Sequence, residues 1–97
     1  MKVINIELLT KFGIKYPDAS KPLDTWLQIA RDAKWGHLMD IKTTLSKTTD
    51  FVEGKTIFNI GGNKYRLITK ISYKLGIIKI DDVLTHQEYD EGKWKNS

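Results

Sequence analysis

Two short stretches of the sequence carry the residues that could do chemistry. In FNIGGNKYRLITKISY, residues 58–73, the cations Lys64, Arg66 and Lys70 alternate along one side of an expected strand. Residues 54–80 contain six lysines and arginines and no aspartate or glutamate. Cations on a rigid strand suit a phosphate backbone, and an arginine can bind a phosphate through two parallel hydrogen bonds. Lysines on an outer strand also serve solubility, so the charge pattern leaves nucleic-acid binding and a solvated face both open.

The second stretch is LTHQEYD, residues 84–90. His86 precedes Tyr89 by three positions, and on a turn of helix positions three apart share a face. RNA can be cut without a metal when a base deprotonates the ribose 2′-hydroxyl, an acid protonates the leaving 5′-oxygen and cations hold the extra charge. Histidine can be base or acid near neutral pH, and tyrosine is a good hydrogen-bond donor. A surface histidine and a packed tyrosine could share this spacing by chance.

Composition narrows the other possibilities. The 97 residues, 40% of them hydrophobic, can bury one core, so we expect a single domain over residues 1–97. With no cysteine, only two histidines and no carboxylate cluster on the basic face, we predict no metal site and no cofactor. The first residues do not resemble a signal peptide, and no apolar run approaches the roughly 18 residues of a membrane span, so we expect a cytoplasmic protein.

A strand and a helix are expected first. Residues 2–5, KVIN, form a short stretch that contains two β-branched residues and indicates a strand. Asn5 is predicted to cap a helix whose apolar residues recur on one stripe. This helix should end at Tyr16, because the position before Pro17 disfavours helical dihedral angles.

A second amphipathic helix should begin near Ser20, with Pro22 in its first turn, and end at Trp35. Residues 37–50 indicate only a short helical turn followed by a loop rich in threonine and serine. Two helices therefore precede most of the sheet.

From Phe51 onward the apolar period changes to two, which indicates strands. Turns are expected at residues 61–62 and 74–76, with another strand at 77–80. Ile68 interrupts the polar side of the alternation. The predicted fold is α+β, in the order β-α-α-β-β-β with a short C-terminal helical turn. Because the apolar side of the sheet must cover the helices, we expect the basic side to be exposed.

Four stretches together resemble the HigB toxins, a branch of the RelE-like superfamily of toxin–antitoxin systems. They are KYPDASKPLDTWLQIARDAKW, DIK, FNIGGNKYRLITKISY and THQEYD, and the resemblance runs from about Met1 to Asp90. It implies two helices packed on a curved, antiparallel-rich sheet. It also implies ribosome-dependent cleavage of messenger RNA in the A site, and an HigA-like antitoxin with a helix-turn-helix domain.

The resemblance assigns roles to individual residues. Arg66 matches the arginine that binds the scissile phosphate from a central strand, and His86 and Tyr89 match the C-terminal source of acid and base groups. Asp90 could orient His86 or Tyr89, or cap a helical turn.

Lys64, Asn59 and Lys70 are expected substrate contacts. One departure from the family pattern is the pair Asp81 and Asp82, where a basic residue is expected. These acids must point away from the phosphate site or weaken it. A catalytically silent RNA- or ribosome-binding module, and a subunit whose basic face meets an acidic protein, therefore remain as alternatives to a ribonuclease.

Overall fold

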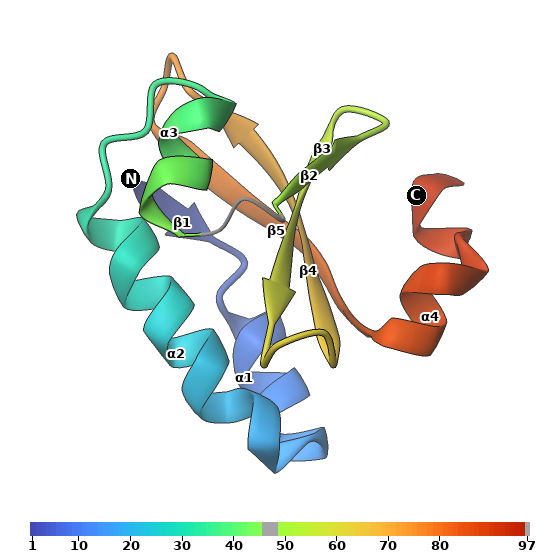
Figure 1. Ribbon diagram of the computed structural model, residues 1–97. Helices are drawn as coiled ribbons and strands as arrows, with labels where there is room; N and C mark the ends of the chain where they lie inside the picture. The colour runs from blue at the N-terminus through green and yellow to red at the C-terminus, as the bar shows by residue number, and fades with distance from the viewer. Residues whose placement is uncertain (46–48, 97) are drawn as a thin grey trace.

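The computed structural model describes residues 1–45 and 49–96. Its elements are β1 (Lys2–Ile4), α1 (Glu7–Lys15), α2 (Pro17–Asp32), α3 (Leu38–Thr44), β2 (Asp50–Val52), β3 (Lys55–Ile60), β4 (Tyr65–Ser72), β5 (Ile77–Thr85), α4 (His86–Glu91) and the 3-10 helix η1 (Lys93–Asn96). Within these residues five strands form one sheet in the order β1-β5-β4-β3-β2 (Figure 1). Only the β1–β5 pairing is parallel there. The α+β prediction is confirmed, with α3 and β2 added to the expected order.

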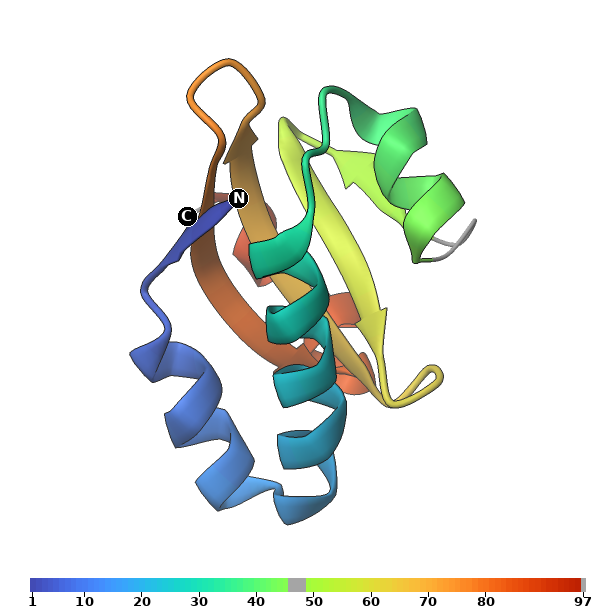
Figure 2. The ribbon, with the colours of Figure 1, turned by 90° about the vertical axis from the view of Figure 1, so that its left-hand side faces the viewer.

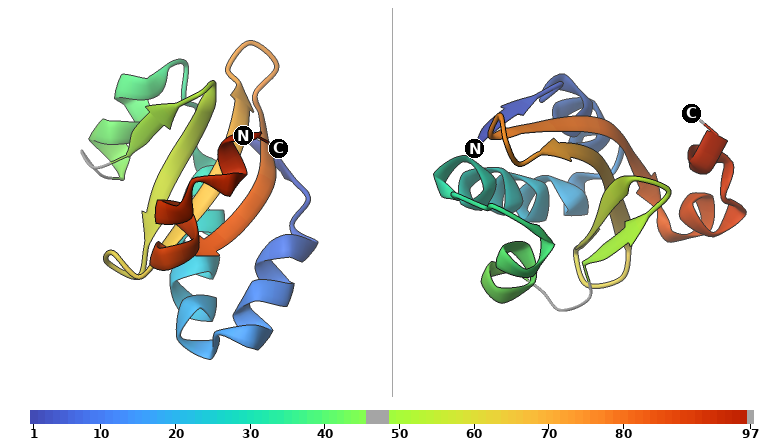
Figure 3. Two further views of the ribbon diagram at one scale, coloured as in Figure 1. Left: turned by 90° about the vertical axis from the view of Figure 1, so that its right-hand side faces the viewer. Right: turned by 90° about the horizontal axis from the view of Figure 1, so that it is seen from above.

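The sheet lies between two layers of unequal size. Helices α1 and α2 lie side by side across one face (Figure 2), and α4 and η1 lie against the other face, in front of β4 and β5 (Figure 3). The main core fills the α1–α2 side. Its fully or nearly fully buried members include Ala19, Leu23, Ala30, Ile41, Phe58, Leu67, Ile78 and Ile80. The helices therefore take the apolar side of the alternation seen in the sequence.

Aromatic rings join the helices to the central strands. The ring of Phe12 meets that of Tyr65 edge-on, with centroids 5.2 Å apart, and Trp26 meets Phe58 in the same way at 5.2 Å. Such edge-to-face pairs add to the free energy gained by area burial. They fix the start of β4 and the middle of β3 against the helical layer.

The predicted cap at Asn5 is wrong. Asn5 has a φ of +67°, and the N-cap of α1 is Ile6. The Asn5 side-chain amide instead donates to the carbonyl of Ile80 on β5, at 3.1 Å. Asparagine tolerates the left-handed conformation better than most residues, so Asn5 serves the turn between β1 and α1.

Helix α2 differs from its predicted bounds at both ends. It begins at Pro17 rather than near Ser20, because a proline has no N–H to lose at the first helical position and its φ already suits the helix. Pro22 consequently lies inside the helix rather than in its first turn. The helix ends at Asp32, short of Trp35. The same proline thus ends α1 and starts α2.

The weakly patterned segment after α2 contains more helix than expected. Helix α3 spans Leu38–Thr44, and Ile41 within it is fully buried. Residues 46–48, in the predicted loop, lie outside the described residues. Helix α3 is held because its apolar side chain enters the main core.

The expectation of a bare basic face is wrong. A second hydrophobic cluster lies on that side of the sheet, formed by Ile57, Ile68, Leu84 and Trp94. Ile68, the residue that interrupts the polar alternation, is fully buried in this cluster. The chain after β5 folds back over this face of the sheet (Figure 3), where Trp94 packs in the same cluster as Ile68 and removes part of the face from solvent.

Candidate active site

Strand pairing brings the predicted site residues other than Lys70 to one end of the sheet. Arg66 on β4 lies opposite Asn59 on β3 and Leu84 on β5. Strand β5 ends one residue before His86, whose backbone N–H donates to the carbonyl of Lys64 at 2.9 Å. Residues far apart in the sequence therefore meet where β4 begins and α4 starts (Figure 3).

A capping box fixes the short helix α4. The Thr85 hydroxyl accepts from the Glu88 N–H at 3.2 Å, and the Glu88 carboxylate accepts from the Thr85 N–H at 3.0 Å. The helix ends at Gly92, which has the left-handed conformation common after helices. These caps set the positions of His86 in the first turn and Tyr89 one turn later.

The Arg66 side chain is half-buried and held by the protein itself. Its Nη1 donates to the carbonyls of Asn63, at 3.1 Å, and Tyr65, at 3.2 Å. Its Cζ lies 5.3 Å from the centroid of the Tyr89 ring, within cation–π range. The guanidinium is thus positioned next to the phenol without any ligand.

His86 and Asp90 form a pair across one turn of α4. The Nδ1 of His86 lies 2.9 Å from the Asp90 carboxylate, and both side chains are at least half exposed. A carboxylate that accepts from Nδ1 leaves Nε2 as the nitrogen for proton transfer. Of the roles open to Asp90, the geometry favours orienting His86.

Tyr89 is partly buried and packs against Trp94. Its ring stacks on that of Trp94, with centroids 5.0 Å apart and planes 11° from parallel. Burial raises the pKa of the Tyr89 phenol, the charges of Asp50 and Asp90 raise it further, and Arg66 opposes them. The phenol therefore stays protonated near neutral pH and can donate a hydrogen bond.

The family model for the HigB toxin, the RelE-like toxic component of a toxin–antitoxin system, matches residues 19–92. This range is well over half of the chain. The chain belongs to the HigB toxin family. The resemblance seen in the sequence is confirmed, and the family implies an antitoxin as partner. No curated protein gives a match to the chain. All seven predicted site residues fall inside the matched range: Asn59, Lys64, Arg66, Lys70, His86, Tyr89 and Asp90.

A β-bulge in this HigB chain places Asp81 among the cations. Ile68 pairs with Asp82 and Thr69 with Ile80, so Asp81 is the extra residue on β5. Its carboxylate lies 3.7 Å from the Nζ of Lys55 and 3.8 Å from that of Lys70. Asp81 does not point away from the basic face. It neutralises part of it.

Lys70 is separated from the other predicted contacts. It lies four residues along β4 from Arg66, about 13 Å for an extended chain. Its ion pair with Asp81 belongs to the far half of the face. The carboxylate of the neighbouring Asp82 accepts a hydrogen bond from the Val83 N–H at 2.8 Å. Burial raises the pKa of Asp82.

Lys64 is turned toward the helical layer. Its Nζ lies 3.3 Å from the carboxylate of Asp18 on α2, which also accepts a 2.5 Å hydrogen bond from the Tyr65 hydroxyl. The hydrogen bond from Tyr65 lowers the pKa of Asp18, and Lys64 lowers it further. The same hydrogen bond raises the pKa of Tyr65 to about 12. Lys64 therefore links β4 to α2 at the edge of the site.

Trp94 is the residue of this group that the sequence did not reveal. It lies two positions beyond the family match, among charged residues, yet only 5% of it is exposed. Its ring nitrogen donates to the Tyr89 carbonyl at 2.9 Å. The sequence signal for it is a single large aromatic residue in a polar C-terminal segment, which by itself does not indicate burial.

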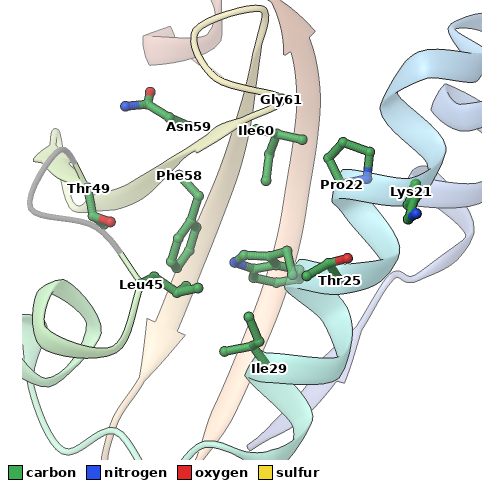
Figure 4. A pocket seen from close by; sticks show the side chains of 11 residues that line it. Lys21, Pro22, Thr25, Ile29, Leu45, Thr49, Phe58, Asn59, Ile60 and Gly61 are labelled. Carbon is green, nitrogen blue, oxygen red and sulfur yellow. The ribbon is translucent and has the colours of Figure 1, made fainter.

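An apolar groove of about 370 Å³ lies on the other side of β3. Its lining includes Pro22, Trp26, Ile29, Leu45, Phe58 and Ile60. The side chains of Phe58 and Ile60 face it, whereas Asn59 between them points the other way (Figure 4). The groove therefore belongs to the helical side and is distinct from the Arg66 group.

The described residues contain neither a cluster of metal ligands nor a membrane-spanning helix. No group of three or more histidine, cysteine, aspartate or glutamate side chains in residues 1–45 and 49–96 is arranged to hold a metal ion. In the same part of the chain, no helix has the length and apolar character needed to cross a membrane.

Proposed function

We propose that this HigB chain is a ribosome-dependent endoribonuclease that cuts messenger RNA in the A site. The observation that carries the proposal is the grouping of Arg66, His86 and Tyr89 at one end of the sheet. It gathers a phosphate-binding cation and two proton-handling groups. The toxin would act in the cytoplasm, where ribosomes translate, and an HigA-like helix-turn-helix antitoxin would restrain it.

Arg66 is assigned to the scissile phosphate. Negative charge grows on the non-bridging oxygens as the 2′-oxygen attacks phosphorus, and a guanidinium already in place stabilises that charge without having to reorganise. Its contacts with two carbonyls and the Tyr89 ring supply this positioning. A lysine would keep the charge and lose the planar fork.

His86 is assigned to proton transfer through Nε2, since Nδ1 faces Asp90. The 2′-oxygen loses its proton to a base and forms a bond to phosphorus. The bond from phosphorus to the 5′-oxygen breaks, and that oxygen takes a proton from an acid. The products are a 2′,3′-cyclic phosphate and a 5′-hydroxyl, and neither step needs a metal.

Tyr89 complements His86 as a donor. Because its pKa is raised, mainly by burial, it is a poor base at neutral pH. Its protonated hydroxyl suits a hydrogen bond to the phosphate or to the leaving oxygen.

The site is short of a strong base, which supports the dependence on the ribosome. The ribosomal A site would order the messenger RNA so that the 2′-oxygen lies in line with the bond to be broken. Such alignment is worth several kcal/mol in related intramolecular reactions, on the order of 7 kcal/mol or more at best.

The catalytically silent RNA- or ribosome-binding module has one observation in its favour. The Asp81 carboxylate lies beside the ammonium groups of Lys55 and Lys70 and partly neutralises them. The face is therefore less positively charged than its number of lysines suggests. Both proposals predict ribosome binding. Only the ribonuclease predicts new messenger RNA ends.

The test is expression of the chain alone, followed by mapping of new RNA ends and single-turnover cleavage on programmed ribosomes. His86→Ala should cut roughly a hundredfold more slowly, and Arg66→Lys about tenfold more slowly, with ribosome affinity nearly unchanged. His37→Ala and Arg31→Lys are matched controls, because they alter the other histidine and the other arginine of the chain. Wild-type cleavage by both His86→Ala and Tyr89→Phe would refute the assignment of catalysis to α4.

A further inference from the structure

We infer that Trp94 is a positioning residue of this site, which acts by holding Tyr89 of α4 in place against Arg66. The inference rests on the proposed function, since it names a residue that site requires. Trp94 lies outside the range that the family model matches.

The burial of Trp94 is unusual for its place in the chain. It lies between Lys93 and Lys95 in a polar segment, yet only 5% of it is exposed. It packs in the cluster of Ile57, Ile68 and Leu84 on the sheet face that carries Arg66. This contact anchors the end of the chain to the middle of the sheet.

Trp94 contacts Tyr89 in two ways. The rings stack with centroids 5.0 Å apart, and the indole N–H donates to the Tyr89 carbonyl at 2.9 Å. Helix α4 has six residues and none of its side chains is fully buried. A helix this short is not stable by itself, so tertiary contacts must fix the side chains it presents.

A buried lysine binds the backbone carbonyl of Trp94. The Nζ of Lys55, a residue only 3% exposed, donates to the Trp94 carbonyl at 3.1 Å. The same Nζ lies 3.7 Å from Asp81 in the bulge of β5. Contacts with β3 and β5 thus fix the position of Trp94. Trp94 in turn holds Tyr89 through ring stacking and a hydrogen bond.

The ring of Tyr89 is the link to the reacting centre. Arg66 lies over it at 5.3 Å, so a rotation or shift of the ring would move the surface against which the guanidinium is held. The charged groups around the phenol are Asp50 on β2, Arg66 on β4 and Asp90 on α4. Burial is the largest single cause of the raised Tyr89 pKa, so the loss of Trp94 should lower that pKa toward its usual value of 10.0.

The test compares Trp94→Met, which fills the space with a flexible chain, and Trp94→Phe, which keeps a flat ring but lacks the N–H. Trp94→Met should lower kcat on programmed ribosomes about tenfold with KM changed less than about twofold, since small misplacements of catalytic groups cost rate. Trp94→Phe should recover most of kcat. The Tyr89 pKa, identified by comparison with Tyr89→Phe in an absorbance titration, should fall in Trp94→Met and return in Trp94→Phe. Trp94→Leu is the reserve if Trp94→Met does not fold.

Two controls separate positioning from loss of stability. Leu27→Ala weakens the core on the helical side, away from the site, and Lys93→Ala removes an exposed neighbour of Trp94. Leu27→Ala should lower the melting temperature without moving the Tyr89 pKa or the kcat of the folded fraction. Lys93→Ala should resemble wild type in all three measurements.

The outcomes distinguish this inference from the proposed function. An unchanged Tyr89 pKa in Trp94→Met overturns the positioning role whatever the rate, and so does a wild-type kcat in a wild-type background that cleaves. If the wild-type chain cuts no ribosome-bound RNA, the proposed function fails. The Tyr89 titration then decides the positioning role alone: a fall in pKa that Trp94→Phe reverses supports it.

Discussion

The buried pair of Lys55 and Asp81 gives a quantitative test of how the site face is held. Lys55 is 3% exposed and its Nζ lies 3.7 Å from the Asp81 carboxylate. Removing one partner of a buried pair leaves an uncompensated charge and costs about 3–5 kcal/mol. Because Lys70 shares the carboxylate and the Asp81 side chain is 13% exposed, we expect the lower end, about 3 kcal/mol, for Asp81→Asn. For a chain of this length that lowers the melting temperature by roughly 12–24 °C.

The assay is a double-mutant cycle by urea unfolding. Lys55→Met should destabilise the fold, partly through its lost bond to the Trp94 carbonyl, and the double variant Lys55→Met/Asp81→Asn should recover about 2 kcal/mol relative to the sum of the single changes. The matched control is the pair of Lys64 and Asp18. Its atoms are closer, 3.3 Å apart, but its side chains are 68% and 53% exposed.

Distance and burial predict opposite orders for the coupling energies of the two ion pairs. If separation decided the coupling, the Lys64–Asp18 pair would be the stronger. We expect the reverse, because water and salt screen exposed charges. A coupling for Lys55–Asp81 no larger than that for Lys64–Asp18 would refute the reasoning, and would show that water reaches Lys55.

Three further predictions concern the cap, the pH dependence and the substrate. Thr85→Ala removes one half of the α4 capping box and should lower the free energy of unfolding by about 1 kcal/mol in urea titrations. Since the Tyr65 hydroxyl lowers the pKa of Asp18 below its usual 3.8, the stability lost in Asp18→Asn should be constant above about pH 5 and vanish as the pH falls through the folded-state pKa. Cleavage should persist in EDTA once ribosome integrity is controlled, and free RNA at equal enzyme should be cut far more slowly than ribosome-bound RNA.

The elements that carry the site were predictable because each has a local signal. A period of two from Phe51 onward and the glycines at 61–62 indicate the β3–β4 hairpin, and both glycines have the positive φ that such turns need. The spacing of Thr85 and Glu88 is a sequence signature for a helix start, and α4 begins there. Because the motifs fix Arg66 on a strand and His86 at a helix start, pairing of β4 with β5 is enough to bring them together.

Other features depend on contacts that no local pattern records. Asparagine is a common N-cap residue, but the Asn5 side-chain amide donates a hydrogen bond to the carbonyl of Ile80 on β5, seventy-five residues away. Lys70 falls in the basic alternation, but a bulge in β5 places Asp81 against it. A bulge changes which side chains face each other without changing the apolar period on either side, so no sequence pattern indicates that ion pair.

The paired lysines also change what the basic stretch can do. Lys55 and Lys70 share Asp81, and Lys64 faces Asp18, so three of the six cations in residues 54–80 lie beside carboxylates. Arg66 instead is held by two carbonyls and an aromatic ring, which leave its charge unneutralised. A broad cationic strip would bind RNA from solution by releasing counterions. A focused charge beside a donor and a histidine is better suited to stabilise a transition state than to capture a free strand, so binding energy must come from elsewhere. In the proposed reaction that source is the ribosome, which already holds the messenger RNA.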